Sequence, residues 1–250
     1  MNTQQIKNYA PSAREKFLEN INVIFDNYKI NEKDIENSNA EQDIDENSPP
    51  RDRIIHEIIM NHYEDIEEFK ESMAYTWFNR FVALRYLEIH KFFGHGFRLL
   101  SNRNKNNKVV PEITRNLSAV LHDFRVTQAA DPLELEQDII SSLIDDHSTG
   151  KEEEVYRFLI LQHCYFLSKP LGIMFAASGD VSYLFMPTDL LNSKLSVIAD
   201  ILVPYSTIIC NSMSTLSPSI CTKTPLVILS LLRRVTMPSF TLRAAIPTIP

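Results

Sequence analysis

Several histidines, cysteines and acidic residues have the chemistry for metal binding or nucleophilic catalysis, but their spacing matches no catalytic motif. His56, Glu57 and His62 invite comparison with the zinc-protease motif, whose two histidines share one helical face. Here the histidines are six residues apart, so a helix would point them in different directions. His163 and Cys164 are sequence neighbours and also face different ways on a helix. The sequence therefore predicts no metal site and no thiol–imidazole pair.

Phosphate-binding loops are also disfavoured, because the chain holds only 5 glycines in 250 residues. Gly94-His-Gly96 lacks the third glycine of a dinucleotide-binding loop and the strand that should precede it. We interpret it as a turn after a long helix, with glycine taking a positive φ. The acidic run at 152–154 fits a helix start, where negative charge is favoured by the helix dipole.

A basic cluster between residues 91 and 115 is the main candidate for a binding surface. Lysine and arginine can neutralise DNA phosphates without a fixed fold, and a solvated surface loop is the alternative. The candidate DNA-backbone contacts are Arg98, Arg103, Lys105, Lys108 and Arg115.

Aromatic residues at helical spacing suggest either a stacking platform for bases or part of the core. They are Trp77, Phe78, Phe81 and Tyr86. Such spacing is typical of core residues, so we favour the core.

The hydrophobic pattern predicts a mainly α fold over residues 1–203. Apolar residues recur every three or four positions within 11–28 and 52–90, and Pro187-Thr-Asp189 is a helix start signal. The expected helices are 11–28, 52–90 with a break near Asn61, 111–126, 132–144, 152–168 and 187–201. Residues 36–50 are acidic and polar, which predicts a linker or disordered loop. Two short apolar stretches, 172–177 and 183–186, are candidates for a small β-hairpin.

The last fifty residues differ in composition from the rest of the chain. All 32 acidic residues lie within residues 1–200, and 204–250 is a Ser/Thr/Pro-rich segment without any acid. We expect a poorly structured tail there, and an out-of-frame origin is one hypothesis for it. Its longest apolar stretch is far below the ~20 residues of a membrane helix. The start of the chain is polar, and the three cysteines are odd in number and have no C-x-x-C spacing. We therefore expect a cytoplasmic protein without membrane contact.

Two segments resemble one protein family. The first is Y-A-P-S-A-R-E-K-F at residues 9–17, and the second is A-Y-T-W-F-N-R-F-V-A-L-R-Y-L-E at 74–88, followed by G-F-R-L-L-S at 96–101. Both resemble PglX, the adenine-specific DNA methyltransferases of the BREX phage-defence system. The resemblance covers roughly residues 1–200 and implies an N-terminal region of a longer, site-specific enzyme.

What the resemblance implies must be separated from what this sequence contains. PglX proteins transfer a methyl group from S-adenosylmethionine to adenine N6 of DNA and assemble with other BREX components. Their N-P-P-Y-type motif, which holds the extruded adenine, is absent here, so no catalytic, cofactor-binding or metal residue is assigned. We expect a truncated fragment that binds no cofactor itself; the alternative is a non-catalytic helical DNA- or partner-binding module. Arg80 and Arg85 fit a helix surface or a buried ion pair equally well.

Overall fold

The part of the chain that the structure describes holds seven helices with defined bounds, further helical residues at 117, 119–120 and 197–198, and no strand. The computed structural model describes residues 3–38, 44–103, 110–117, 119–120, 152–192 and 195–198. Its elements, in order, are α1 (Thr3–Tyr28), α2 (Glu32–Glu36), α3 (Pro50–Met60), α4 (Ile66–Ile89), the 3-10 helix η2 (Glu112–Arg115), α7 (Glu152–Ser168) and the 3-10 helix η3 (Val181–Phe185). The mainly α prediction is confirmed. The tail at 204–250 and the helix expected at 132–144 lie outside the described residues.

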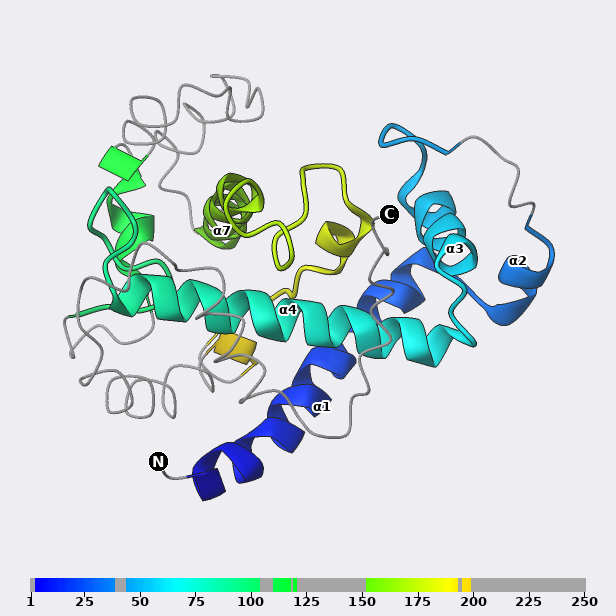
Figure 1. Cartoon of the computed structure of the whole chain (residues 1–250), viewed down its shortest axis with the longest axis horizontal. Helices are drawn as coiled ribbons and strands as arrows, with labels where there is room; N and C mark the ends of the chain where they lie inside the picture. Colours follow the sequence, from blue (N-terminus) through cyan, green and yellow to red (C-terminus); the bar gives the residue numbers. More distant parts are fainter. Residues whose placement is uncertain are drawn as a thin grey trace, which may run out of the picture.

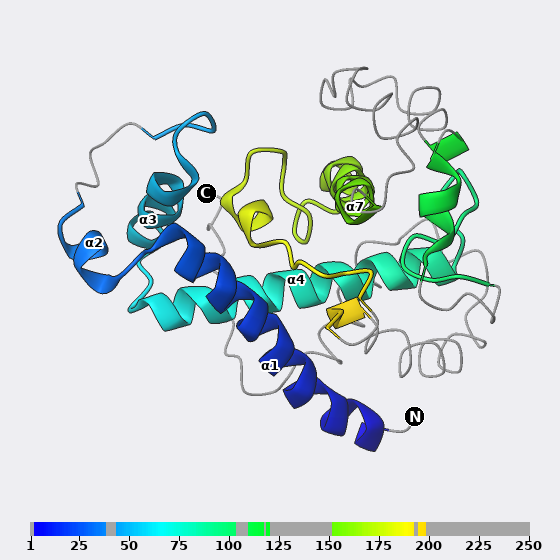
Figure 2. The same cartoon turned by 180° about the vertical axis from the view of Figure 1, so that it is seen from behind.

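Helix α4 runs across the middle of the molecule, where α1 crosses it and α7 lies near its C-terminal half (Figures 1 and 2). All nine residues from 80 to 88 are buried, as expected for a helix enclosed on every side. Phe17 of α1 packs on Phe81 with ring centroids 6.1 Å apart, and Phe25 packs on Phe69 at 5.9 Å. The apolar stripe predicted for the first helix therefore faces α4.

The expected break near Asn61 separates α3 from α4. Asn61 follows the last residue of α3, and His62 has a positive φ of 54°, which a helix cannot continue through. Asp65 then caps α4, because its carboxylate accepts a hydrogen bond from the Glu68 amide at 2.7 Å. Local signals thus set the start of the central helix.

The segments considered for a β-hairpin adopt turns and a 3-10 helix. Residues 171–175 continue from α7 as tight turns, in which the amide of Phe175 bonds to the carbonyl of Leu171 at 3.1 Å. Gly179 has a positive φ of 88°, and Asp180 caps η3 by accepting from the Ser182 amide at 2.9 Å. The two segments do meet, through a 2.7 Å hydrogen bond from the Tyr183 hydroxyl to the Ala176 carbonyl.

The short helix expected from Pro187 is also replaced by a turn, so that prediction was wrong over residues 187–192. Asp189 has a positive φ of 55°, which interrupts a right-handed helix. The amides of Leu190 and Leu191 donate instead to the two oxygens of Glu153, at 2.7 and 2.9 Å. Glu153 at the start of α7 therefore has a bonding role besides the predicted effect of its charge.

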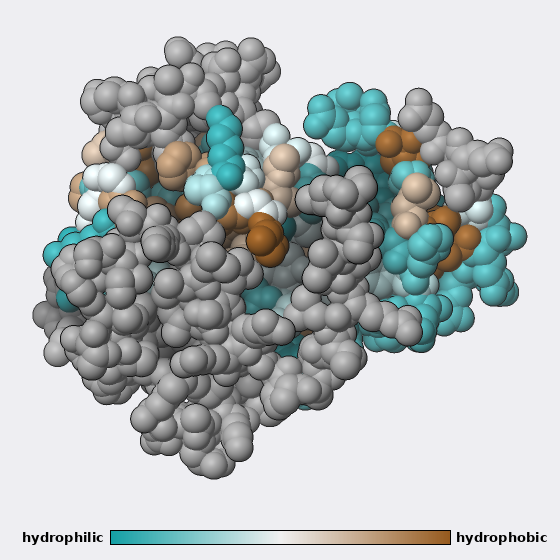
Figure 3. Space-filling view, in the orientation of Figure 1, coloured by the Kyte–Doolittle hydropathy of each residue, from teal (hydrophilic) through white to brown (hydrophobic). Residues whose placement is uncertain are grey.

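The surface over α2 and α3 is largely hydrophilic on the face shown in Figure 3, with a few hydrophobic side chains between polar ones. Asp34 of α2 forms an ion pair with Arg51 of α3 at 2.7 Å. None of the helices that the structure describes is long and apolar enough to span a membrane.

Candidate functional site

The connection from α4 to η2 carries the described part of the basic cluster. Helix α4 ends at Ile89, and Lys91 takes a positive φ of 57°, a common way for a helix to end. Gly96 has a positive φ of 75°, which confirms the predicted glycine turn. Phe93 and Leu99 are buried, so apolar contacts fix this loop, residues 91–103, to the core.

A buried carboxylate at the end of α4 holds the far side of the loop. Glu88 has a fully buried side chain and forms an ion pair with Arg85 one turn earlier. It also accepts hydrogen bonds from the Leu100 amide and, at 2.6 Å, from the Ser101 hydroxyl. Arg85 reaches the same hydroxyl at 2.9 Å. This network attaches residues 100–101 to α4. Of the two roles expected for Arg85, it shows the buried ion pair.

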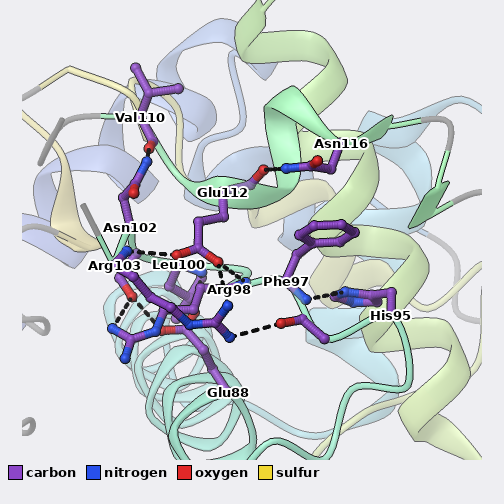
Figure 4. A network of polar contacts seen from close by, with 12 residues as sticks. Glu88, His95, Phe97, Arg98, Leu100, Asn102, Arg103, Val110, Glu112 and Asn116 are labelled. Atoms are coloured by element: carbon purple, nitrogen blue, oxygen red, sulfur yellow. Dashed lines mark hydrogen bonds and ion pairs between the residues drawn. The ribbon is translucent and has the colours of Figure 1, made fainter.

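A second carboxylate, Glu112 of η2, brings two of the candidate arginines together (Figure 4). It accepts the backbone amides of Arg98 at 3.1 Å and Arg103 at 2.6 Å. The Arg103 guanidinium lies 3.4 Å from the same carboxylate and donates to the Gly96 carbonyl at 2.8 Å. Glu112 therefore holds residues 98 and 103 of the loop close together.

The candidate DNA contacts thus differ in their surroundings. Arg98 is half-buried, with its guanidinium 3.4 Å from the Ser101 hydroxyl. The Arg103 side chain is 53% exposed although it pairs with Glu112, and Arg115 is exposed at the end of η2. Lys105 and Lys108 lie outside the described residues. The structure brings Arg98 and Arg103 to one carboxylate, a contact that sequence spacing did not reveal.

The middle of α4 holds a second polar attachment, to the segment that precedes and includes η3. The Trp77 indole donates to the Ser182 carbonyl at 2.8 Å. Arg80 donates to the Ser182 hydroxyl at 2.7 Å and to the Met174 carbonyl at 3.1 Å. Its guanidinium carbon also lies 4.3 Å from the Tyr183 ring centroid and 5.1 Å from that of Trp77. Arg80 is only 2% exposed, so it is buried rather than on the helix surface.

The aromatic residues considered as a stacking platform belong to the core. Trp77 and Phe81 are fully buried, and Tyr86 is 9% exposed. Phe78 is partly buried and contacts the Phe17 ring edge-on at 6.1 Å. They are therefore unavailable for stacking on bases, as the favoured interpretation of their spacing predicted.

Two histidines that no motif connected meet where the loop touches α7. His95 of the loop and His163 of α7 have their Nε2 atoms 3.0 Å apart. His163 is 1% exposed, and burial lowers its pKa to about 3. The neighbouring Cys164 is fully buried, and burial raises the pKa of its thiol to about 12, so it is no nucleophile.

The described residues offer few features that could hold a metal or a cofactor. No group of three or more His, Cys, Asp or Glu side chains that could hold a metal occurs in the described ranges. A pocket of about 50 Å³ lies beside α3, far below the ~300–1,000 Å³ of usual ligand pockets. It is lined by Ser38, Ile44, Arg51, Asp52, Ile55, His56 and Ile59. Glu88 and Glu112 fix the loop, and the Arg103 side chain stays half-exposed, so this part of the molecule can present positive charge to a partner.

Comparison with known proteins places this scaffold beside two methyltransferases. The chain is 30% identical over 204 residues to the adenine-specific methyltransferase BrxX of Escherichia coli O9:H4 (strain HS), a match that covers 76% of this chain and 16% of BrxX. It is 29% identical over 119 residues to the adenine-specific methyltransferase PglX of Lacticaseibacillus casei (strain Zhang), covering 47% of this chain and 9% of PglX. No protein-family profile matches the chain.

The matched regions make up less than a fifth of either relative, which agrees with a PglX-like N-terminal region. The chain is thus a homologue of the adenine-specific methyltransferases BrxX and PglX, at about 30% identity over part of their length.

Proposed function

We propose that this chain is the helical N-terminal part of a PglX-type enzyme that methylates adenine N6 at specific DNA sites, using S-adenosylmethionine. The observation that carries the proposal is the 204-residue match to BrxX. In this proposal the enzyme acts on DNA in the cytoplasm, together with other BREX components in phage defence. The methyl-transfer residues are contributed from outside the residues described here, since the sequence holds no N-P-P-Y-type motif.

The polar contacts of α4 support a scaffolding role for the segment shared with the family. Within that segment, Trp77 and Arg80 bind residues near η3, and Arg85 and Glu88 bind the loop. These side chains are buried, so packing and hydrogen bonding explain why this segment has such an unusual set of residue types. We infer that the region presents its loops in a fixed position to the rest of an enzyme.

A chimera tests the proposal. The matched segment of E. coli BrxX would be replaced by the corresponding residues of this chain, and N6-methyladenine in the host DNA would be measured. We expect methylation to persist in this chimera and to be lost when the segment is deleted. Methylation that survives the deletion would contradict the proposal, because the region would then be dispensable.

The alternative function, a helical module that binds the DNA backbone, is favoured by the half-exposed Arg103 in a basic loop. Gel-shift titrations over a salt series would test it. If Arg103, Lys105 and Lys108 contact phosphates, each alanine substitution should weaken binding and reduce the log–log salt slope by about one unit. Lys33→Ala on the exposed side of α2 removes the same charge far along the chain and should leave the slope unchanged.

Glu112→Gln gives a second arm for the DNA test. The carboxylate competes with phosphate for the Arg103 guanidinium, which lies 3.4 Å from it. Glutamine removes the negative charge and keeps one acceptor oxygen, so it can still accept either the Arg98 or the Arg103 amide, which bond to different oxygens of Glu112. We expect tighter DNA binding by this variant, and unchanged binding would count against a phosphate contact at Arg103.

A further inference from the structure

The His95–His163 contact is part of a continuous chain of hydrogen bonds between the loop and α7. The Phe97 amide donates to His95 Nδ1 at 3.0 Å, and the two Nε2 atoms lie 3.0 Å apart. At the other end His163 Nδ1 lies 2.6 Å from the Leu159 carbonyl oxygen. All four ring nitrogens are therefore engaged, and the three bonds join a loop amide to a helix carbonyl.

The partners at the two ends fix the proton on each ring. A carbonyl only accepts, so His163 Nδ1 carries a proton and its Nε2 accepts in the neutral ring. An amide only donates, so His95 Nδ1 is unprotonated and its Nε2 donates to His163. The chain thus has places for two ring protons.

A third proton cannot be added without breaking this chain. On His95 it would occupy Nδ1, where it faces the Phe97 amide hydrogen. On His163 it would occupy Nε2, and His95 would then have to move its own proton to Nδ1 in order to accept. Both routes place two donors against each other at Phe97, so both cost the hydrogen bond from the Phe97 amide to His95 within the loop.

We propose that His95 and His163 form an acid-sensitive latch, which fixes the Phe97 amide, and with it the conformation of loop 91–103 beside α7, only while both rings are neutral. Opening the latch frees the Phe97 amide next to Arg98, whose own amide is bound by Glu112. Acidification therefore loosens the loop that carries Arg98 and Arg103. This inference is independent of the proposed methyltransferase function.

The surroundings favour the neutral state. Phe93 packs against both rings, with centroids 5.6 Å from His95 and 4.9 Å from His163, and Phe97 stacks on His95 at 6.0 Å. Burial lowers the pKa of His163 to about 3, with a further contribution from the nearby His95.

The elements around the latch carry further charged and titratable groups. Two carboxylates, Glu88 and Glu112, are each paired with an arginine. Other charged or titratable side chains on α4, the loop, η2 and α7 include Arg80, Lys91, Arg98, Arg115, Tyr156 and Arg157.

Nuclear magnetic resonance on the full chain tests the latch. Near neutral pH, imidazole ¹⁵N shifts should show a proton on Nε2 of His95 and on Nδ1 of His163; the opposite assignment at either ring would overturn the proposal. On acidification, Phe97 amide protection, corrected for intrinsic exchange, should fall by about tenfold or more while amides of α4 stay protected. Constant protection while His95 titrates, or loss of protection together with α4, would also overturn it.

Two variants sharpen this measurement. His95→Asn removes the titrating ring, so the corrected Phe97 exchange should no longer depend on pH. His62→Asn is the matched control, because His62 is exposed at a positive φ that asparagine tolerates, and it should respond like the parent chain. A His95→Asn variant with the parent's pH response would contradict the latch. If that variant fails to fold, the ring-proton assignment in the parent chain remains decisive.

Discussion

Removing the Glu88 carboxylate is expected to destabilise the chain strongly, because three groups depend on it. Its side chain is 0% exposed and pairs with Arg85, whose side chain is 6% exposed. Glu88→Ala leaves that arginine buried without its counter-ion and leaves the Leu100 amide without its acceptor. Breaking a buried ion pair costs about 3–5 kcal/mol, and an unsatisfied buried amide costs about 1–3 kcal/mol. We expect a loss of about 4 kcal/mol, since water entering the vacated space offsets part of the sum.

The same helix provides a matched control. Glu67 and Lys70 also form an ion pair three residues apart, at 2.8 Å, but the Glu67 side chain is 71% exposed. Exposed pairs of this kind contribute about 0–1 kcal/mol. Glu67→Ala should therefore change the free energy of unfolding by less than about 1 kcal/mol.

Urea titration followed by tryptophan fluorescence measures both variants. The chain has a single tryptophan, Trp77, and it is fully buried, so its emission reports the loss of the core around α4. The shift in the midpoint multiplied by the slope gives the change in free energy. Equal shifts for Glu88→Ala and Glu67→Ala would refute the assignment of Glu88 as a buried anchor of the loop.

Three further predictions concern the core. Lowering the pH from about 7.5 to about 5 should cost about 2 kcal/mol through His163, because its pKa is about 3 when folded and about 6.5 when unfolded, so only the unfolded chain takes up the proton. His163→Leu should flatten this part of the stability–pH curve, and an unchanged curve would contradict the reasoning. Arg80→Lys should lose about 1–3 kcal/mol in urea titrations, because an ammonium cannot reproduce the bonds to both Met174 and Ser182; an unchanged midpoint would count against these bonds. In a variant with Cys210→Ser and Cys221→Ser, the remaining Cys164 should react with a thiol reagent only after unfolding, since it is fully buried and its pKa is about 12. Rapid labelling of the native variant would disprove its burial.

Helix positions followed from the sequence where one local pattern was strong. The stripe that begins at Phe17 predicted the core face of α1, and the acidic start at 152–154 marked the first turn of α7, which spans the expected residues 152–168. The interruption near Asn61 was also correct. Helix α1 begins at Thr3, so Pro11, which was expected to open it, lies inside the helix. Proline lacks the amide hydrogen that an interior helix position donates, and for this reason the sequence pattern placed the helix start at Pro11.

Contacts between distant segments could not be predicted from those patterns. His95 and His163 are 68 residues apart, and Arg80 and Ser182 are 102 apart. Their meeting depends on how the chain returns to α4, which neither periodicity nor propensity specifies. The failed expectation of a helix from Pro187 has the same origin, since the distant Glu153 binds the amides that a helix would have used.

Under the proposed function, this chain serves as a scaffold within a PglX-type methyltransferase, and the methyl-transfer site lies elsewhere in that enzyme. Isothermal titration of the full chain with S-adenosylmethionine tests it most directly. We expect no binding heat at micromolar cofactor concentrations. Saturable binding with a micromolar dissociation constant would contradict it.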